Sequence, residues 1–136
     1  MDYGKLKKNF EDHRFLTSYF ETREEAAAYL KEKIRGEKVG FGGSMTCQEM
    51  GLYELLKENN QVVWHWEGGA LRDAVLTDVY ITSANALAET GEIVNIDGNG
   101  NRVSSTLYGH QKVYFLVGVN KVAPDFEAAL WRARNV

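Results

Sequence analysis

Short apolar runs alternate with helical patterns along most of this chain, and this alternation limits the folds that it can adopt. Each run is rich in β-branched and aromatic residues, as strands are, and a segment with the apolar spacing of a helix follows it. Helices placed between strands form crossover connections, which join parallel strands. The apolar runs lie at 39–41, 62–66, 78–82 and 112–119, and the helical patterns lie at 46–58, 71–76 and from Pro124 onward. The sequence therefore predicts helices layered on a mostly parallel sheet.

The last apolar run and the segment before it depart from this simple repeat. The run KVYFLVGV, at 112–119, is nearly all apolar and predicts a strand that is buried on both faces. Residues 90–108 contain two alternating segments on either side of the turn-rich DGNGN, which predicts a hairpin in place of a crossover helix. The predicted fold class is α/β, a Rossmann-like three-layer sandwich with a mostly parallel sheet and an inserted hairpin.

The first 36 residues are predicted to form a helical arm that precedes the core, 38–136, of a single domain spanning 1–136. Helical patterns cover 5–9 and 22–35, and the second begins with a capping box formed by Thr22 and Glu25 and ends at Gly36. Between them, the aromatic segment RFLTSYF at 14–20 predicts packing on the chain's own core or on a partner subunit. A homo-oligomer formed through this arm is one expectation.

Composition excludes several classes of protein. A chain of 136 residues with 44% hydrophobic residues and one proline can bury a sizeable core, so it is not disordered. One cysteine cannot form an internal disulfide or supply a zinc or iron–sulfur ligand set, which favours a reducing, cytoplasmic compartment. The net charge is −3 and no basic stripe is present, so nucleic acid is not an expected partner. No apolar run is long enough to predict a membrane partner or an export signal.

Small or hydrogen-bonding residues follow each apolar run. In a parallel sheet the carboxyl ends of the strands lie at one edge, where open α/β sheets bind their ligands. We therefore expect a ligand site at this edge, although any strand must end in turn residues. The clusters are Gly42-Gly43-Ser44, His65-Trp66-Glu67, Ser83-Ala84-Asn85 and Asn120-Lys121.

The segment from Gly42 to Thr46 lies between a predicted strand and the start of a helix. Free backbone amides and the positive end of a helix dipole favour an anion in this arrangement. The segment is not a dinucleotide fingerprint, because Met45 occupies the position of the third glycine, and it lacks the Gly-Lys of a phosphate-binding loop. The two interpretations are a carboxylate or phosphate site and a bare tight turn.

The helix that follows this loop carries two further candidate residues. Thr46 and Glu49 have the spacing of a second capping box, which predicts a structural role for Glu49. Cys47 lies in the first helical turn, where a thiol pKa can be depressed, but no histidine is placed to activate it. We therefore interpret Cys47 as a small half-buried side chain.

The segment from Asp97 to Asn101 resembles the first ligands of an EF-hand loop. Arg102 stands at the position of the invariant glycine and Tyr108 at that of the bidentate glutamate, so calcium binding and a metal site are not predicted. The residues instead combine amides, a carboxylate and the Arg102 guanidinium in one turn, which suits a small polar ligand.

Three segments resemble the LUD-domain (lactate utilization) family of bacterial proteins. They are GGSMTCQEMGL at 42–52, TSANALAETGEIVNIDGNGNRV at 82–103 and VGVNKVAPDFEAALWRAR at 117–134, and the resemblance runs from Lys38 to the end of the chain. It implies the fold shared by ribose-5-phosphate isomerases and CoA transferases. It also implies an association with an iron–sulfur oxidoreductase that oxidises L-lactate to pyruvate. The cysteines of the cluster-binding forms are missing, so no cofactor is expected in this chain.

The resemblance implies a set of site residues that largely coincides with those at strand ends and in the DGNGN segment. The acid–base candidates are Glu92 and Asp97, because proton transfer needs a carboxylate within reach of the substrate. The ligand-binding candidates are Gly42, Gly43, Ser44, Thr46, Glu49, Ser83, Asn85, Asn95, Asn101, Arg102, Asn120 and Lys121.

Two functions are consistent with these observations. In the first, the carboxyl edge of the sheet binds a small anionic molecule, either as a binding site alone or as a catalytic site. In the second, the protein is a non-catalytic subunit or scaffold of an iron–sulfur lactate-oxidising complex, and the aromatic arm binds the partner. A minimal family member without activity is a third interpretation.

Overall fold

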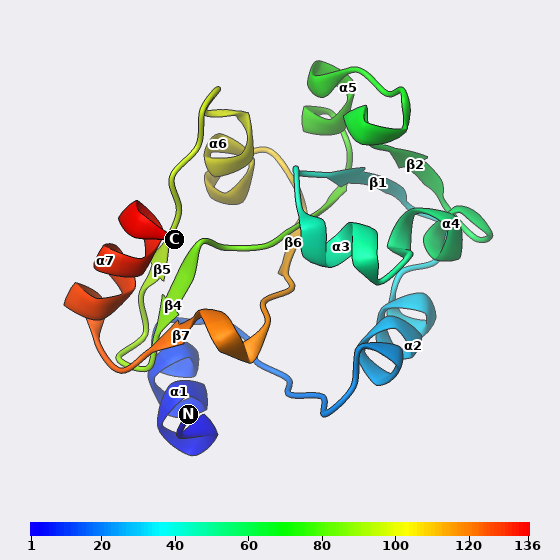
Figure 1. Ribbon diagram of the computed structural model, residues 1–136. Coiled ribbons are helices and arrows are strands. Elements are labelled where there is room, and N and C mark those ends of the chain that lie inside the picture. The colour runs from blue at the N-terminus through cyan, green and yellow to red at the C-terminus, as the bar shows by residue number, and fades with distance from the viewer. The chain divides into compact units, whose positions relative to one another are not determined.

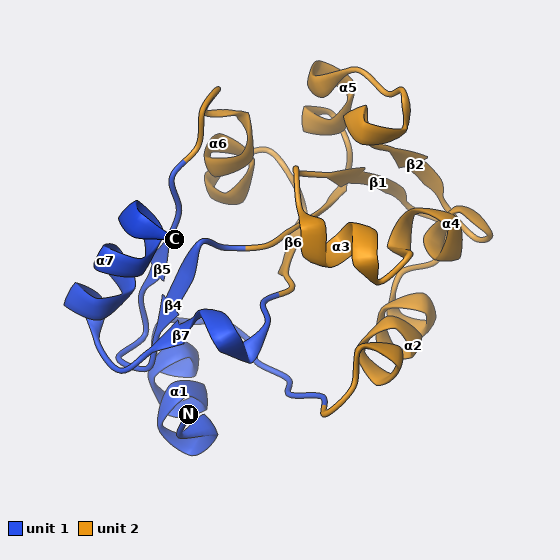
Figure 2. Ribbon diagram, in the orientation of Figure 1, with its two compact units in different colours: residues 1–20, 84–96, 117–136 blue, residues 21–83, 97–116 orange.

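The computed structural model describes all 136 residues, which form two compact units (Figures 1 and 2). Unit 1 comprises residues 1–20, 84–96 and 117–136, and unit 2 comprises residues 21–83 and 97–116. Each unit has its own sheet. No helix in the chain is both long enough and apolar enough to cross a membrane.

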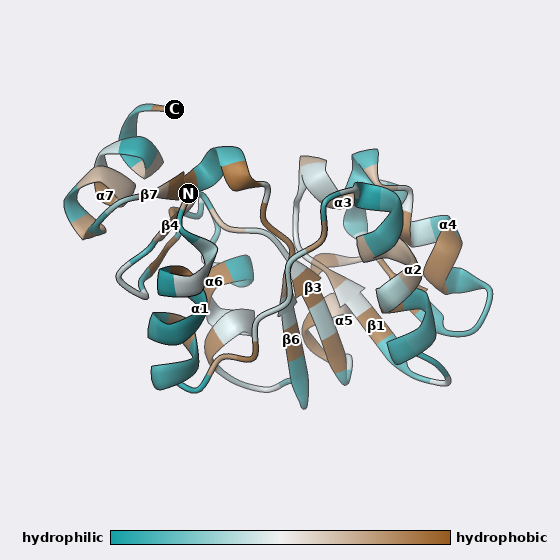
Figure 3. Cartoon of the chain, turned by 90° about the horizontal axis from the view of Figure 1, so that it is seen from below, coloured by the Kyte–Doolittle hydropathy of each residue, from teal (hydrophilic) through white to brown (hydrophobic).

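Unit 2 is built on a four-stranded parallel sheet in the order β2-β1-β3-β6. The strands are β1 (Lys38–Phe41), β2 (Gln61–Val63), β3 (Val79–Thr82) and β6 (Lys112–Phe115). Figure 3 shows β6, β3 and β1 side by side with apolar residues along them. This arrangement confirms the predicted parallel sheet and its four strands, although β2 and β6 end before the apolar runs at 62–66 and 112–119 do.

Helices cover both faces of this sheet. One face packs against α2 (Arg23–Lys33), α3 (Met45–Glu49) and α4 (Leu52–Lys57), and the other packs against α5 (Leu71–Val75) and α6 (Asn101–Leu107). The main core lies on the first face, where Val39 and Phe41 of β1 meet Leu52 and Leu56 of α4. The three layers confirm the predicted Rossmann-like sandwich. The chain between β2 and α5 forms the 3₁₀ helix η1 (His65–Glu67).

Unit 1 contains a three-stranded sheet in the order β5-β4-β7. Its strands are β4 (Ala86–Ala88), β5 (Ile93–Val94) and β7 (Val122–Ala123), which follows the 3₁₀ helix η2 (Val119–Lys121). Helix α7 (Phe126–Asn135) packs on this sheet through a cluster of small residues, which include Ala129 and Ala133. Helix α1 (Tyr3–Asp12) is tied to the β4–β5 turn because the Asn9 side chain donates to the Glu89 carbonyl.

The helix starts largely follow the predicted capping. Thr22 caps α2, since its hydroxyl accepts a hydrogen bond from the Glu25 N–H at 3.1 Å. Asp125, which follows Pro124, caps α7 by accepting from the Ala128 N–H. The helical pattern at 46–58 is divided into α3 and α4, because Gly51 adopts a φ of 66°, which residues with a side chain rarely adopt.

Two predictions about strands are wrong. The hairpin is formed by β4 and β5 around Thr90 and Gly91, whereas DGNGN leads into helix α6. Strand β6 is not buried on both faces. It pairs only with β3, Lys112 is exposed, and the rest of the strand is half-buried. An edge strand has one neighbour, so an apolar run alone does not establish a central position.

Candidate functional site

The carboxyl edge of the unit 2 sheet collects the first group of predicted site residues. The loop Gly42–Ser44 follows β1, Ser83 follows β3, and the chain returns to unit 2 at Asp97. Nine of the fourteen predicted residues belong to unit 2. They are Gly42, Gly43, Ser44, Thr46, Glu49, Ser83, Asp97, Asn101 and Arg102.

Ser44 begins the helix after β1. Its hydroxyl accepts a hydrogen bond from the Cys47 N–H at 3.1 Å, and its side chain is buried. The predicted capping box of Thr46 and Glu49 is therefore wrong, because Thr46 lies inside α3 and Ser44 is the cap. Cys47 is fully buried, in contact with the core, rather than half-buried. The Ser44 hydroxyl thus satisfies one of the amide donors that we predicted for an anion.

Gly42 is a glycine because three side chains surround its Cα. A Cβ at this position would lie 2.7 Å from the Tyr80 hydroxyl, 2.8 Å from the Thr82 hydroxyl and 3.0 Å from Cγ of Arg102. At Gly43 a Cβ would lie 3.3 Å from Cζ2 of Trp66. These close approaches hold the loop between β3, α6 and η1, so its position is set by packing on both sides.

Asp97 and Arg102 are joined through the start of α6. The Oδ2 atom of Asp97 accepts the N–H groups of Arg102 at 2.8 Å and Val103 at 3.1 Å. Nη1 of Arg102 lies 3.5 Å from the Gly43 carbonyl oxygen. The Asp97 carboxylate therefore fixes the first turn of α6, and this turn places the Arg102 guanidinium against the glycine loop of β1.

The Tyr80 side chain lies beneath this arrangement and is 1% exposed. Burial raises the pKa of its hydroxyl to about 12, and the nearby Arg102 guanidinium opposes this rise. The ring stacks on His110 with centroids 4.7 Å apart. Nδ1 of His110 lies 2.6 Å from the Thr77 carbonyl, so we expect this nitrogen to carry the proton.

This shifted pKa predicts a loss of stability at high pH. The hydroxyl is neutral in the folded state up to about pH 12 but ionises near pH 10 when unfolded, so its contribution is complete below pH 10 and is lost between pH 10 and 12. The expected loss is roughly 2–3 kcal/mol. Urea unfolding at pH 9, 10, 11 and 12 should show a shallower decline for Tyr80→Phe than for the parent. Equal declines would contradict the assignment.

Unit 1 holds the remaining predicted residues. The side-chain oxygen of Asn95 accepts from the Asn85 N–H at 3.0 Å, and that of Asn85 accepts from the Ile96 N–H at 3.0 Å. These reciprocal bonds extend the pairing of β4 and β5. Glu92 accepts hydrogen bonds from the Thr90 hydroxyl at the turn of the same hairpin. Asn120 and Lys121 lie in η2, where Asn120 is exposed.

Comparison with models of known protein families shows to which family this chain belongs. A family model for the LUD domain matches residues 3–136. The chain belongs to the LUD-domain family. The match includes the N-terminal arm, so it extends beyond the core where the three segments resemble the family. Comparisons with curated proteins and with solved structures found no match. LUD domains are associated with lactate-utilization proteins.

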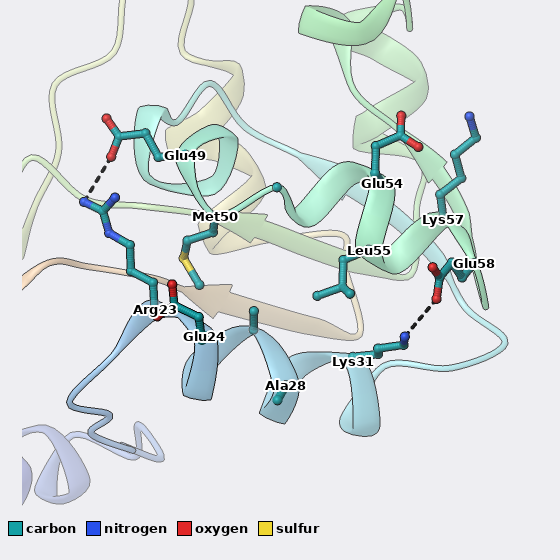
Figure 4. A pocket seen from close by; sticks show the side chains of 12 residues that line it. Arg23, Glu24, Ala28, Lys31, Glu49, Met50, Glu54, Leu55, Lys57 and Glu58 are labelled. Carbon is teal, nitrogen blue, oxygen red and sulfur yellow. Dashed lines mark ion pairs between the residues drawn. The ribbon is translucent and has the colours of Figure 1, made fainter.

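Glu49 of this LUD domain lies at a groove rather than within the cluster around Arg102. The groove has a volume of about 840 Å³ and runs between α2 and the α3–α4 pair (Figure 4). An ion pair between Arg23 and Glu49 closes one end at 3.1 Å, and one between Lys31 and Glu58 closes the other at 2.8 Å. Glu49 therefore connects α3 to α2.

The candidate site of this LUD domain also includes three residues outside the predicted ligand-binding set, of which only Trp66 lies in a predicted strand-end cluster. Trp66 contacts Gly43, and Tyr80 and Thr82 contact Gly42. Along β3, Tyr80 and Thr82 alternate with the core residues Val79 and Ile81, so they point to the opposite face of the sheet. This alternation was the sequence signal that Tyr80 and Thr82 share a face with Gly40 and Gly42. No three His, Cys, Asp or Glu side chains gather in a group that could hold a metal ion.

The hydrogen bonds of Asp97 predict a structural effect on this LUD domain. Asp97→Ala should lower the free energy of unfolding by about 1–2 kcal/mol, because two N–H groups lose a charged acceptor. Asp97→Asn keeps an acceptor oxygen and should recover at least half of that loss in urea unfolding. As a control, Glu92→Ala should change stability by less than about 0.5 kcal/mol, because Glu92 bonds only to an exposed hydroxyl. Equal losses for all three variants would contradict this role.

Proposed function

We propose that this LUD-domain protein binds a small carboxylate- or phosphate-bearing molecule at the carboxyl edge of the four-stranded sheet. The observation that carries the proposal is the placement of the Arg102 guanidinium against the Gly43 carbonyl, at the loop where β1 ends. Guanidinium groups bind carboxylates and phosphates through paired N–H donors. The position also matches the edge at which open α/β sheets bind ligands.

The remaining residues of unit 2 have defined roles in this proposal. Asp97 holds Arg102 in place through the first turn of α6. We propose Asn101, the first residue of α6, and Ser83, the residue after β3, as further ligand contacts, because both follow elements that end or begin at this edge. We also propose Asp97, which lies in the same unit, as the group to test for proton transfer.

The family supports a carboxylate as the first ligand to test. LUD domains are associated with lactate utilization, and both lactate and pyruvate are small carboxylates. We propose that this chain acts in lactate utilization and that its ligand is lactate, pyruvate or a related anion.

A thermal-shift screen of the full chain tests the proposal. The panel contains lactate, pyruvate, sugar phosphates and CoA esters, because a ligand that binds only the folded state raises the unfolding temperature. Arg102→Gln should weaken binding of the active compound about 10- to 100-fold, as expected for the loss of a charge-assisted hydrogen bond. Arg102→Lys should retain part of the affinity, because it keeps the charge.

Arg35→Gln is the matched control for this screen. Arg35 is exposed and lies just before β1, so this substitution removes one positive charge at the amino end of the sheet. If Arg102→Gln and Arg35→Gln bind the same compound with equal affinity, the assignment of Arg102 is wrong. If no compound stabilises the parent, the small-anion function is wrong for the tested classes.

A second function, that of a subunit in an iron–sulfur lactate-oxidising complex, is favoured by the N-terminal arm. Leu16 is 98% exposed, although the arm around it is fixed by contacts of Phe15 with Phe10 and of Tyr19 with Tyr3. Phe15 and Tyr19 of the same segment are also partly exposed, and a cluster of apolar side chains in solvent is a typical contact for another protein. The partner is an iron–sulfur subunit or a second copy of this chain.

Leu16→Asp tests this second function more cleanly than removal of residues 1–20, because Leu6 and Phe10 of α1 are buried in unit 1. Sedimentation of the parent alone, and mixed with a purified iron–sulfur subunit, should show an assembly that Leu16→Asp weakens at least tenfold. An unchanged assembly, or a parent that stays monomeric in both samples, would exclude the arm as the interface.

A further inference from the structure

Three aromatic rings form a continuous stack from the core of unit 2 to its surface. Trp64 stacks on Phe41 with centroids 4.9 Å apart, and Trp66 stacks on Trp64 at 5.2 Å with an angle of 21° between the planes. Phe41 and Trp64 are buried, whereas Trp66 is 39% exposed. The Trp66 ring is therefore fixed by the buried Trp64, which is fixed in turn by Phe41. Because the Trp66 side chain is already ordered, a ligand that stacks on it costs little conformational entropy.

Gly43 connects this stack to the proposed anion site. Its Cα faces the Trp66 ring, since a Cβ there would lie 3.3 Å from Cζ2 and 3.6 Å from Cε2. Its carbonyl oxygen lies 3.5 Å from Nη1 of Arg102. Gly43 therefore lies between the Arg102 guanidinium and the partly exposed Trp66 ring. Any side chain at position 43 would fill the space beside that ring.

We infer that the anion bound at this edge carries a planar aromatic ring that stacks on Trp66, so that the ligand is an aromatic carboxylate or phosphate. The inference rests on the function proposed above. The flat face of an indole attracts either a planar ring or a cation. The Arg102 guanidinium beside Gly43 repels a cation and attracts an anion, so the two groups together select a ring that carries a negative charge.

The comparison of benzoate with cyclohexanecarboxylate tests this inference directly. The two compounds have the same charge and nearly the same size, but only benzoate is planar. Stacking on an aromatic side chain contributes enough affinity that benzoate should bind about tenfold more tightly, as measured by titration of the full chain. The same titration by fluorescence, in a Trp131→Phe variant that removes the exposed tryptophan of α7, should report benzoate through the stacked pair of Trp64 and Trp66.

Three variants separate the ring from the charge. Trp66→Leu should reduce benzoate affinity to that of cyclohexanecarboxylate. Trp66→Phe keeps an aromatic ring and should retain the preference for benzoate, so it serves as the test if leucine disturbs the stack. Arg102→Gln should weaken both compounds. Trp131→Leu, the control at another exposed tryptophan, should change neither.

Each other outcome overturns the inference in a distinguishable way. If the parent binds both compounds equally and Arg102→Gln weakens both, the anion site stands and the stacking role of Trp66 is wrong. If benzoate is preferred but Trp66→Leu leaves the preference intact, the ring binds elsewhere. If neither compound binds, while lactate, pyruvate or a sugar phosphate of the earlier panel binds through Arg102, the ligand carries no such ring. If nothing binds, the proposed function itself fails.

Discussion

Replacement of Trp64 with alanine should lower the free energy of unfolding by about 3–5 kcal/mol, the range for removal of a large buried aromatic side chain. Trp64 is 2% exposed and lies between Phe41 and Trp66, with Tyr53 tilted against it at 6.4 Å. The truncation leaves a cavity between two rings that are fixed by their own neighbours. Nε1 of Trp64 has no hydrogen-bond partner, so the loss arises from packing and not from an unpaired acceptor.

Urea unfolding followed by circular dichroism measures this effect. Trp131→Ala is the matched control, because the same side chain is removed from a helix surface where it is 63% exposed. The control should lose less than about 1 kcal/mol. Similar losses at the two positions would show that Trp64 does not support the core of unit 2.

Gly40→Ala should be the second severe substitution, with a loss of about 3 kcal/mol or more. Gly40 lies on β1 and faces α5, and a Cβ would lie 2.5 Å from the Ala74 carbonyl oxygen and 2.6 Å from the Thr77 hydroxyl. The Thr77 hydroxyl donates to that same carbonyl at 2.7 Å. Neither group can move without separating α5 from the sheet, so the added methyl group strains the backbone.

Gly98→Ala is the matched control for this substitution. A Cβ at Gly98 would meet nothing within 4 Å, and its φ lies outside the left-handed region, so the change should be within about 0.5 kcal/mol of neutral. The unfolding temperatures of both variants, measured side by side, give the comparison. A Gly40→Ala protein as stable as Gly98→Ala would mean that α5 moves away from β1 at little cost.

The alternation of strands and helices was predictable because it depends on local patterns. Runs such as VYIT at 79–82 are apolar wherever they lie in a sheet, and helix starts such as Thr22 carry their own hydrogen-bonding side chains. The position of a strand within the sheet depends on its neighbours, which the run does not specify. For this reason β6 was predicted to be buried on both faces, although it is a half-buried strand at the edge.

The segment after β5 shows why turn residues do not determine the type of element that comes after them. Asp97, Asn99 and the two glycines between 97 and 101 suit the turn of a hairpin and the start of a helix equally well. The Asp97 carboxylate decides in favour of the helix, since it accepts the Arg102 and Val103 N–H groups. The sequence placed Arg102 in the candidate site, but the contacts of Gly43 with Arg102 and Trp66 required the fold.

The discontinuity of the two units affects how their functions can be separated. The chain passes between unit 1 and unit 2 four times, and β4 at 86–88 pairs with β7 at 122–123 across an intervening piece of unit 2. No continuous fragment consists of one unit alone, because residues 84–96 of unit 1 lie between the two segments of unit 2. During synthesis on the ribosome, unit 1 therefore cannot be completed before α7, near the C-terminus, has emerged. A truncation at either end removes part of unit 1, and the fragment 21–116 keeps unit 2 only together with residues 84–96, which lose the strand and helices that they pack against. The roles of the arm and the sheet edge are therefore best assigned by point substitutions in the full chain.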